Sequence, residues 1–290
     1  MFQTTLAGEV RISGLGIHGG QAATMTLLPA PADSGIVFVR TDVEGERRPI
    51  PALADKVCDT RLATVIADGG PTISTVEHIM AALAGLGVDN AVIEVDGPET
   101  PIVDGAAGDF VEAIDAVGVR TLEGAPRRYI EILRPIEVGQ PGKRAALVPA
   151  ERFEMSVEII FDASAIGTQH LELAIDPASF RAEIASARTF GFIAEVEQLR
   201  AAGLGRGASL ENTIVVDGAQ VLNPEILARP DDFVRHKTLD ALGDLALFGH
   251  PILGRYEASC SGHALNNALV RAAMAQPDAW RLKTLTPEPA

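Results

Sequence analysis

The order of strand-like and helix-like segments along the chain is the feature that most limits its fold. In residues 1–122, short apolar segments bounded by glycine and proline precede two segments with helical spacing. Residues 127–280 repeat this order, with strands first and helices after them. Two halves of this kind indicate an α+β fold with two layers of similar design.

The expected elements and boundaries are as follows. In the first half we expect strands at residues 9–12, 23–28, 35–40 and 90–95, and helices at residues 74–84 and 109–117. In the second half we expect strands at residues 129–137, 145–149 and 153–160, and helices at residues 177–187, 233–248 and 263–275. The segment 123–128 predicts a domain boundary, the glycine-rich residues 201–208 a mobile loop, and residues 283–290 a frayed tail.

Composition restricts the class of partner and the compartment. The net charge of −15 argues against nucleic acid, because phosphate binding depends on lysine and arginine. The two cysteines, Cys58 and Cys260, are too few for a disulfide framework. Neither has a CxxC partner, which excludes a cysteine zinc site. The opening residues lack the pattern of a signal peptide, and no stretch reaches the ~18 apolar residues of a membrane helix. We therefore expect a soluble, cytoplasmic protein without a transmembrane segment.

The first segment dense in reactive groups is Ser74-Thr-Val-Glu-His78. Ser74 as an N-cap and Glu77 three positions later fit a capping box, in which both side chains satisfy free N–H groups at a helix start. In that interpretation His78 is an ordinary first-turn histidine. The alternative is that Glu77 and His78 are neighbouring functional groups.

The second such segment is Arg235-His-Lys-Thr-Leu-Asp-Ala-Leu-Gly-Asp244. His236 and Asp240 are four residues apart, so on a helix they share one face. This spacing lets one helix offer a nitrogen and an oxygen ligand to a divalent metal. The simpler alternative is a His–Asp pair on a solvated helix, although the intervening leucines give this helix an apolar side.

The two segments together match the ligand count of a catalytic zinc site. Such a site takes three protein ligands and leaves one position open for water, and His78, His236 and Asp240 supply that number. Glu77, which adjoins a ligand, could accept the proton of the water.

A second acid–base group follows in Ser261-Gly-His263, at the start of an expected helix. A carboxylate such as Asp244 beside the His263 imidazole would favour its charged form, which suits a general acid.

Four longer stretches resemble a known enzyme family. TVEHIMAALAGLGVDN, ARTFGF, VRHKTLDALGDL and SGHALNNALV resemble the UDP-3-O-acyl-N-acetylglucosamine deacetylases of lipid A biosynthesis. The resemblance begins at GEVRISGLGIHGG and extends almost to the C-terminus. It implies two β-α-α-β layers packed as a sandwich with the active site between them. It also implies a βαβ insert in the second layer, at about residues 190–216, that forms a hydrophobic passage for the acyl chain.

The resemblance also implies roles for individual residues. The implied ligands of one Zn²⁺ ion per chain, with Fe²⁺ as an alternative metal, are His78, His236 and Asp240. The implied catalytic residues are the general base Glu77, the general acid His263, its carboxylate partner Asp244, and Thr189, whose hydroxyl stabilises the oxyanion.

Further residues are implied to contact the substrate. Lys237 matches a substrate-contacting lysine, and Phe190 and Phe192 belong to the motif that lines the sugar-nucleotide and acyl region. Aliphatic residues that could line the passage, or could equally be ordinary core, are Val196, Leu204, Leu210, Ile214 and Val215. His18 could approach the site from the first layer, and its alternative is a turn histidine.

The expected function is zinc-dependent hydrolysis of the N-acetyl group of UDP-3-O-acyl-N-acetylglucosamine, which commits the substrate to lipid A. The expected partner is that acylated UDP-sugar, bound by a monomer. Two rivals stay open at this point. One is a zinc amidohydrolase for another acyl amide, and the other is a non-catalytic protein that binds metal or a UDP-sugar.

Overall fold

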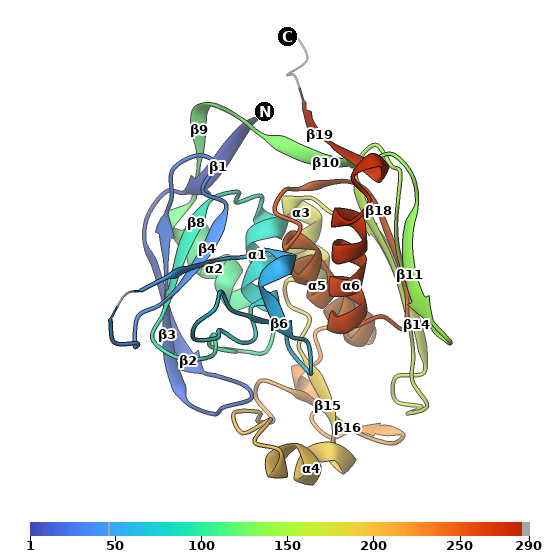
Figure 1. The fold of residues 1–290 in the computed structure, drawn as a ribbon. Coiled ribbons are helices and arrows are strands. Elements are labelled where there is room, and N and C mark those ends of the chain that lie inside the picture. Colours follow the sequence, from blue (N-terminus) through green and yellow to red (C-terminus); the bar gives the residue numbers. More distant parts are fainter. Residues whose placement is uncertain (46, 286–290) are drawn as a thin grey trace.

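A computed structural model describes residues 1–45 and 47–285 of the chain. Two β-sheets form the outer layers, and the long helices fill the space between them (Figure 1). The predicted α+β class with two similarly built layers is confirmed. Among the described residues, no helix combines the length and apolar character that crossing a membrane requires.

The first sheet has the strand order β2-β3-β8-β4-β5. Its bounds are β2 Val10–Leu15, β3 Ala22–Pro29, β8 Ala91–Val95, β4 Ile36–Arg40 and β5 Pro49–Pro51. The central strand β8 runs antiparallel to β3 and parallel to β4. Alternate residues of β8 are fully buried, as expected for a strand that turns one face to a helix layer.

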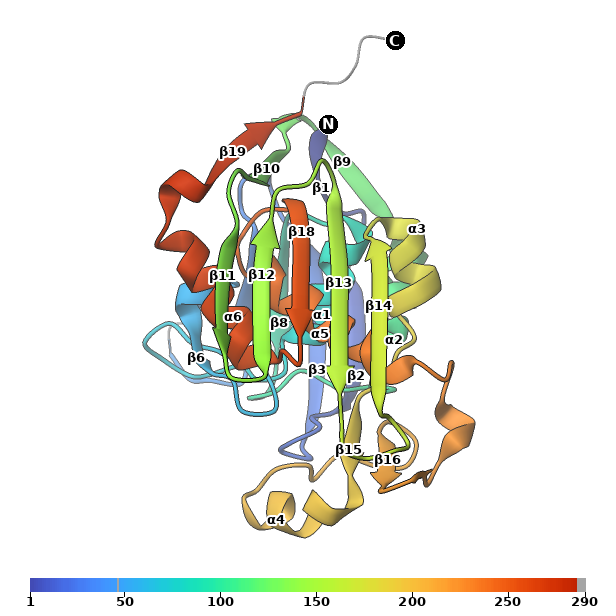
Figure 2. The ribbon, with the colours of Figure 1, turned by 90° about the vertical axis from the view of Figure 1, so that its right-hand side faces the viewer.

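The second sheet repeats this topology with the order β11-β12-β18-β13-β14 (Figure 2). Its bounds are β11 Ile136–Gln140, β12 Lys143–Val148, β18 Ile252–Ser259, β13 Phe153–Ile160 and β14 Thr168–Ala174, with β10 Arg128–Ile132 and β19 Trp280–Thr284 at the end of β18. The central strand β18 is antiparallel to β12 and parallel to β13. In both five-stranded orders the fifth strand in sequence, β8 or β18, therefore lies at the centre.

The helices occupy corresponding places in the two layers. Their bounds are α1 Glu77–Leu86, α2 Gly108–Val117, α3 Pro177–Ser179, α4 Val196–Ala201, α5 Asp232–Ala246 and α6 His263–Met274. α1 and α5 each precede the central strand of their layer, and α2 and α6 each follow it. α1 and α5 pack directly against each other at the boundary between the layers (Figure 1).

Gly243 allows α1 and α5 to approach closely. A Cβ atom on this residue would lie 2.0 Å from the carbonyl oxygen of Glu77, so any side chain would force the two helices apart. Nearly every residue of α1 is buried, because the sheet covers one side of the helix and α5 covers the other. The boundary between the layers is therefore a tightly packed part of the core.

Smaller elements complete the chain. Their bounds are β1 Phe2–Leu6, β9 Val119–Pro126, β6 Val57–Asp59, β7 Val65–Ile66, β15 Phe190–Phe192, β16 Ile214–Asp217 and β17 Gln220–Val221. β15 and β16 are parallel and α4 lies between them in sequence, so the expected βαβ insert is present. It projects from one end of the sandwich (Figures 1 and 2).

Several expected boundaries differ from the structure. The strand expected at residues 129–137 is divided into β10 and β11, because Pro135 has no N–H to donate to a ladder. The helix expected at residues 177–187 is a short α-helix followed by a π-helical turn, Phe180–Ile184. Residues 119–126, which include part of the expected boundary segment, form β9 and pair with β1.

Two expectations concern mobile segments. Residues 283 and 284 belong to β19, and residues 286–290 of the expected frayed tail lie outside the described residues. The glycine-rich loop at residues 201–208 is tied to the first layer. The N–H groups of Arg206 and Gly207 donate to the carbonyl oxygens of His18 and Ile17 at 3.1 and 3.0 Å.

Candidate metal centre

The first turn of α1 carries Glu77 and His78, both buried. The helix starts at Glu77 because Thr75 has a left-handed backbone (φ 63°), which ends the helical path on that side. The capping-box interpretation is wrong, since the N-cap is Val76 and no side chain caps the helix. Glu77 instead accepts a hydrogen bond from the backbone N–H of Thr64 at 2.9 Å, so its carboxylate faces the neighbouring loop.

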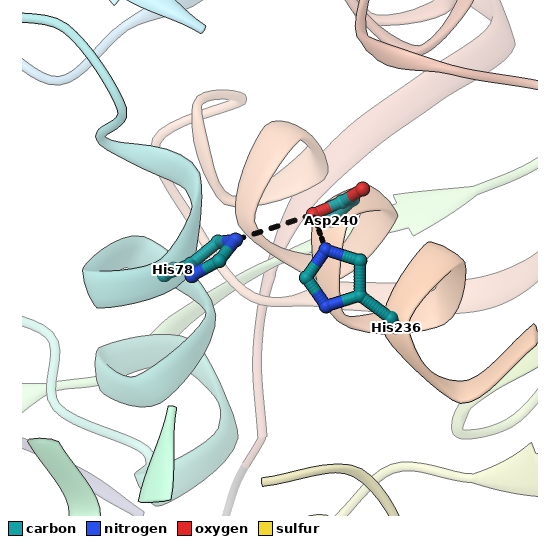
Figure 3. A group of neighbouring side chains, drawn as sticks. All are labelled: His78, His236 and Asp240. Atoms are coloured by element: carbon teal, nitrogen blue, oxygen red, sulfur yellow. Dashed lines mark ion pairs between the residues drawn. The ribbon is translucent and has the colours of Figure 1, made fainter. Parts of the chain in front are cut away.

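His78 meets two residues of α5 across the boundary between the layers. Nε2 of His78 lies 3.6 Å from Oδ1 of Asp240, and Nε2 of His236 lies 3.3 Å from the same oxygen. The three ligand atoms lie within 4.8 Å of one another, and all three residues are buried. Figure 3 shows both imidazoles directing a nitrogen toward Asp240.

The charge states of these groups suit a metal cation. Burial lowers the pKa of His236 to about 3, so its imidazole is neutral and can use a lone pair as a ligand. Burial alone would raise the pKa of Asp240, but the positive charge of the neighbouring Lys237 helps to hold it well below its ordinary value. Two imidazoles and one carboxylate, turned toward a common point, form a three-residue ligand set of the kind that holds Zn²⁺ in hydrolases.

The second ring nitrogens of the two histidines differ in their surroundings. Nδ1 of His236 lies 3.0 Å from the carbonyl oxygen of Ala187, an arrangement that fixes the ring and leaves Nε2 as the ligand atom. Nδ1 of His78 is buried and has no hydrogen-bond partner among the described residues. The orientation of the His78 ring therefore depends on its packing and on what Nε2 binds.

Two acid–base groups flank the ligand set. Nε2 of His263, the first residue of α6, lies 4.0 Å from Oε1 of Glu77 and 4.0 Å from Oδ2 of Asp240. Burial raises the pKa of Glu77. For His263 burial opposes the charged form, but the Asp244 carboxylate, 2.9 Å from Nδ1, raises the pKa of the imidazole to about 10. The pair thus places a carboxyl group of raised pKa opposite an imidazole that is protonated at neutral pH.

Of the two basic residues beside His236, only Lys237 faces the site. Its Nζ donates to Oδ2 of Asp240 at 2.8 Å and lies 5.4 Å from the centre of the Phe190 ring. Arg235 directs its charge away from the site. Its guanidinium is bound to Asp231 and Glu183 on the other side of the helix, where both acids neutralise it.

Four of the expected substrate residues lie in the insert. Phe190 and Phe192 are half-buried and, with Phe161, which directly follows β13, form an aromatic cluster whose ring centres are 5.6–6.3 Å apart. Val196 is half-buried at the start of α4, whereas Ile214 is fully buried beside Phe190 in the β15–β16 ladder. Ile214 therefore belongs to the core that supports the cluster.

Thr189 lies in the short connection that leads into β15. Its N–H donates to the carbonyl oxygen of Gly105, and its own carbonyl accepts from Ile214, both at 2.8 Å. The same connection contains Ala187, whose carbonyl oxygen meets His236. Backbone hydrogen bonds thus fix this segment next to a candidate ligand.

His18 lies on a loop of the first layer that is fastened by Glu99. The Glu99 carboxylate accepts the N–H groups of His18 and Gly19, each at 2.8 Å, and the Thr75 hydroxyl at 3.0 Å. Burial lowers the pKa of His18, and the charges of His263 and His78 act in the same direction. The imidazole is therefore neutral and lies close enough to the site to be influenced by its charges.

Sequence reasoning missed several residues that support the site. Asn266 donates to Oδ2 of Asp244 at 2.8 Å, and its position one turn after His263 was a signal that could have been used. Glu99 and Thr64 come from loops, and no local pattern connects them with residues far away in the chain. Phe161 directly follows β13, and no recognisable motif surrounds it in the sequence.

A buried pair of imidazoles with one carboxylate, flanked by a second carboxyl group and an imidazolium, has the composition of a metal-dependent hydrolase site. The family model described as UDP-3-O-acyl N-acetylglycosamine deacetylase (LpxC) matches residues 3–275. The chain belongs to this family.

Relatives agree with this assignment over nearly the full chain. The chain is 56% identical to a UDP-3-O-acyl-N-acetylglucosamine deacetylase of Phenylobacterium zucineum, over 98% of this chain and 97% of the relative. Relatives of the same name from an Anaeromyxobacter strain and from Myxococcus xanthus are 49% and 48% identical. These alignments cover 98% and 97% of this chain, and 92% and 88% of the relatives.

Proposed function

We propose that this chain hydrolyses the N-acetyl group of UDP-3-O-acyl-N-acetylglucosamine, giving acetate and the free 2-amino sugar, a step in lipid A biosynthesis. The observation that carries the proposal is the placement of Glu77 and His263 on the edge of the His78–His236–Asp240 cluster. Family membership and the names of the relatives support the choice of substrate.

The metal of the proposed reaction is one Zn²⁺ ion per chain, held by His78, His236 and Asp240. Two nitrogen donors and one oxygen donor suit Zn²⁺, and the same set also accepts Fe²⁺. A cation bound there supplies Lewis acidity to the amide carbonyl and to the attacking water. Metal analysis of protein purified without added metal distinguishes the two ions.

Glu77 is the proposed general base. One of its oxygens is occupied by the Thr64 N–H, and the other faces His263 at 4.0 Å, on the side where a water and an acetamide would meet. Burial raises the pKa of Glu77, which makes the carboxylate a better proton acceptor. In the proposed step this free oxygen takes the proton of the water as the water adds to the acetyl carbon.

His263 is the proposed general acid. An amide nitrogen leaves poorly unless it receives a proton, and the imidazolium favoured by Asp244 can provide one from Nε2. Thr189 is proposed to donate its hydroxyl to the developing oxyanion. The fixed backbone of its segment supports this role, because a preorganised donor needs no rearrangement during the reaction.

The substrate is proposed to contact both layers. Lys237 and His18 would meet the polar sugar-nucleotide. The Phe190–Phe192 cluster, flanked by Val196 and supported from the core by Ile214, would meet the acyl chain. Because every one of these residues comes from a single chain, we propose that a monomer is active. The UDP group of the substrate supports a cytoplasmic site of action, where nucleotide sugars are made.

The test is a deacetylation assay on the purified protein with UDP-3-O-acyl-N-acetylglucosamine. We expect acetate release that stops after metal removal and returns with Zn²⁺. Glu77→Gln is expected to retain the metal and to lower turnover by ~100-fold or more, in line with general-base contributions. Glu123→Gln, the same acid-to-amide change at an exposed residue of β9, serves as a matched control.

Other outcomes would point to the rival functions. Hydrolysis of an unrelated acyl amide, with no acetate released from the UDP-sugar, would indicate a different amidohydrolase. Full activity of the metal-free protein would refute the mechanism. Tight binding of the UDP-sugar without any turnover would indicate a binding protein.

A further inference from the structure

Thr64 contacts both the proposed general base, Glu77, and the carboxylate partner of the proposed general acid, Asp244. It is 1% exposed and lies in the loop between β6 and β7 of the first layer. Its backbone N–H donates to Oε2 of Glu77 at 2.9 Å, and its hydroxyl donates to Oδ1 of Asp244 at 2.5 Å. One residue therefore binds the base directly and the carboxylate partner of the acid directly.

The backbone of Thr64 is fixed to the start of α1. Its carbonyl oxygen accepts the N–H of Val76, the N-cap of that helix, at 3.3 Å. Just beyond it, β7 exchanges two hydrogen bonds between Ile66 and Ile73 at 2.9 Å each. Leu62, two residues before Thr64, has a left-handed backbone (φ 63°), which turns the loop toward the site. The hydroxyl is thus presented from a segment anchored at both ends.

Both oxygens of the Asp244 carboxylate accept hydrogen bonds, from three donors in total. Oδ1 accepts the Thr64 hydroxyl, and Oδ2 accepts Nδ2 of Asn266 at 2.8 Å and Nδ1 of His263 at 2.9 Å. Asn266 and His263 both belong to α6 of the second layer. Among the described residues, the hydrogen bond donated by the Thr64 hydroxyl is the one that links the first layer to this carboxylate.

We propose that Thr64 is a positioning residue. It holds the proposed base Glu77 and the proposed acid pair Asp244–His263 in fixed relative positions across the boundary between the layers. The inference rests on the proposed function. The hydroxyl prevents rotation of the Asp244 carboxylate, so the His263 ring stays directed at the position of the leaving nitrogen. The backbone N–H occupies one Glu77 oxygen and leaves the other free for the water.

The test separates the hydroxyl from the rest of the residue. Thr64→Val has nearly the same shape and keeps the backbone N–H, so it removes only the hydrogen bond to Asp244. We expect kcat to fall by about 10- to 100-fold, as is usual for groups that orient a ligand or catalytic side chain, with KM and metal content unchanged. Thr64→Ser keeps the hydroxyl and is expected to restore most of kcat. Thr64→Ala is the second variant if valine impairs folding.

A double-mutant cycle identifies the route of the effect. If Thr64 acts through Asp244, then Thr64→Val in an Asp244→Ala background should lower kcat by less than about 2-fold, because the acceptor of the Thr64 hydroxyl is already absent. Full additivity of the two changes would overturn the proposal. Thr5→Val is the matched control. Its hydroxyl is equally buried and hydrogen-bonded to Asn90 and Ala30, far from the site, so kcat should not change.

A spectroscopic readout makes the inference independent of turnover. We expect the ring-nitrogen NMR signals of His263 to move in Thr64→Val and to return in Thr64→Ser. Signals that stay in place, or a Thr64→Val enzyme as active as the wild type, would overturn the inference. If the wild-type protein releases no acetate, but the His263 signals still move in Thr64→Val, the proposed function is rejected and the Thr64–Asp244 link is retained.

Discussion

Gly243 on α5 lies in backbone contact with Glu77 on α1, and a Cβ atom on the glycine would sit 2.0 Å from the Glu77 carbonyl oxygen. This contact sets the separation of the two helices that carry the candidate ligands. His78 is the next residue on α1, and Asp240 lies one turn before Gly243 on α5. The geometry of the metal centre therefore depends on the absence of a side chain at a position that binds nothing.

Gly243→Ala is expected to weaken metal binding and to destabilise the fold. The added methyl group must displace backbone, and overpacking of this kind costs about 1–3 kcal/mol of unfolding free energy. Bound metal per chain and the thermal midpoint measure the two effects. Gly70→Ala, where the methyl group meets nothing within 4 Å, is the control. A Gly243→Ala protein with normal metal affinity would show that the helix separation is not critical.

Metal binding is expected to stabilise the protein, because the ligands come from both layers and come together only in the folded chain. A free metal concentration 100-fold above Kd should add about 2.7 kcal/mol to the free energy of unfolding. The thermal midpoint of metal-free protein, titrated with Zn²⁺, provides the measurement. His236→Ala should abolish the increase, whereas Glu77→Gln should retain it. An equal increase in both variants would place the ion elsewhere.

The pH dependence of kcat/KM should reveal the His263–Asp244 pair. The protonated imidazole is the proposed acid, so activity should persist below its pKa and decline as the pH rises through about 10. Asp244→Asn removes the charge that favours the imidazolium. The declining limb should then move to lower pH by about one to three units, the usual effect of one neighbouring opposite charge. A limb that stays in place in this variant would contradict the assignment of His263.

Glu99→Ala is expected to impair substrate binding more than chemistry. The change leaves the N–H groups of His18 and Gly19 without their acceptor, which frees the loop that carries His18. Each lost partner costs about 1–3 kcal/mol if the group stays buried. We expect KM to rise while metal content stays normal, and steady-state kinetics with metal analysis measure both. A lower kcat at unchanged KM would show that Glu99 acts instead through Thr75 on the start of α1.

The repeated order of strands and helices was readable from the sequence, as was the i,i+4 spacing that places His236 and Asp240 on one face. The central strand β18 was not predicted. Its residues Arg255 and Glu257 interrupt the apolar pattern. The structure pairs Arg255 with Glu154 on β13 and Glu172 on β14, and Glu257 with Arg144 on β12. Such pairs become visible only when the strand order is known.

The supporting contacts of the site were also beyond the sequence. Thr64 and Asp244 are 180 residues apart, and their hydrogen bond exists only because two layers pack together. The capping box at Ser74 failed for a related reason. The Glu77 carboxylate accepts a hydrogen bond from Thr64 of another loop, and the left-handed backbone of Thr75 shifts the start of the helix to Glu77. Local patterns describe one element at a time, whereas these residues are used between elements.

The doubled topology has a consequence for stoichiometry. A repeated architecture with a ligand set inside each copy would hold two ions per chain. Here the equivalent helices α1 and α5 meet at the seam between the copies and contribute unequally, one ligand from the first and two from the second. A centre on such a seam would be shared by both copies, and among the described residues this is the one such group of candidate ligands.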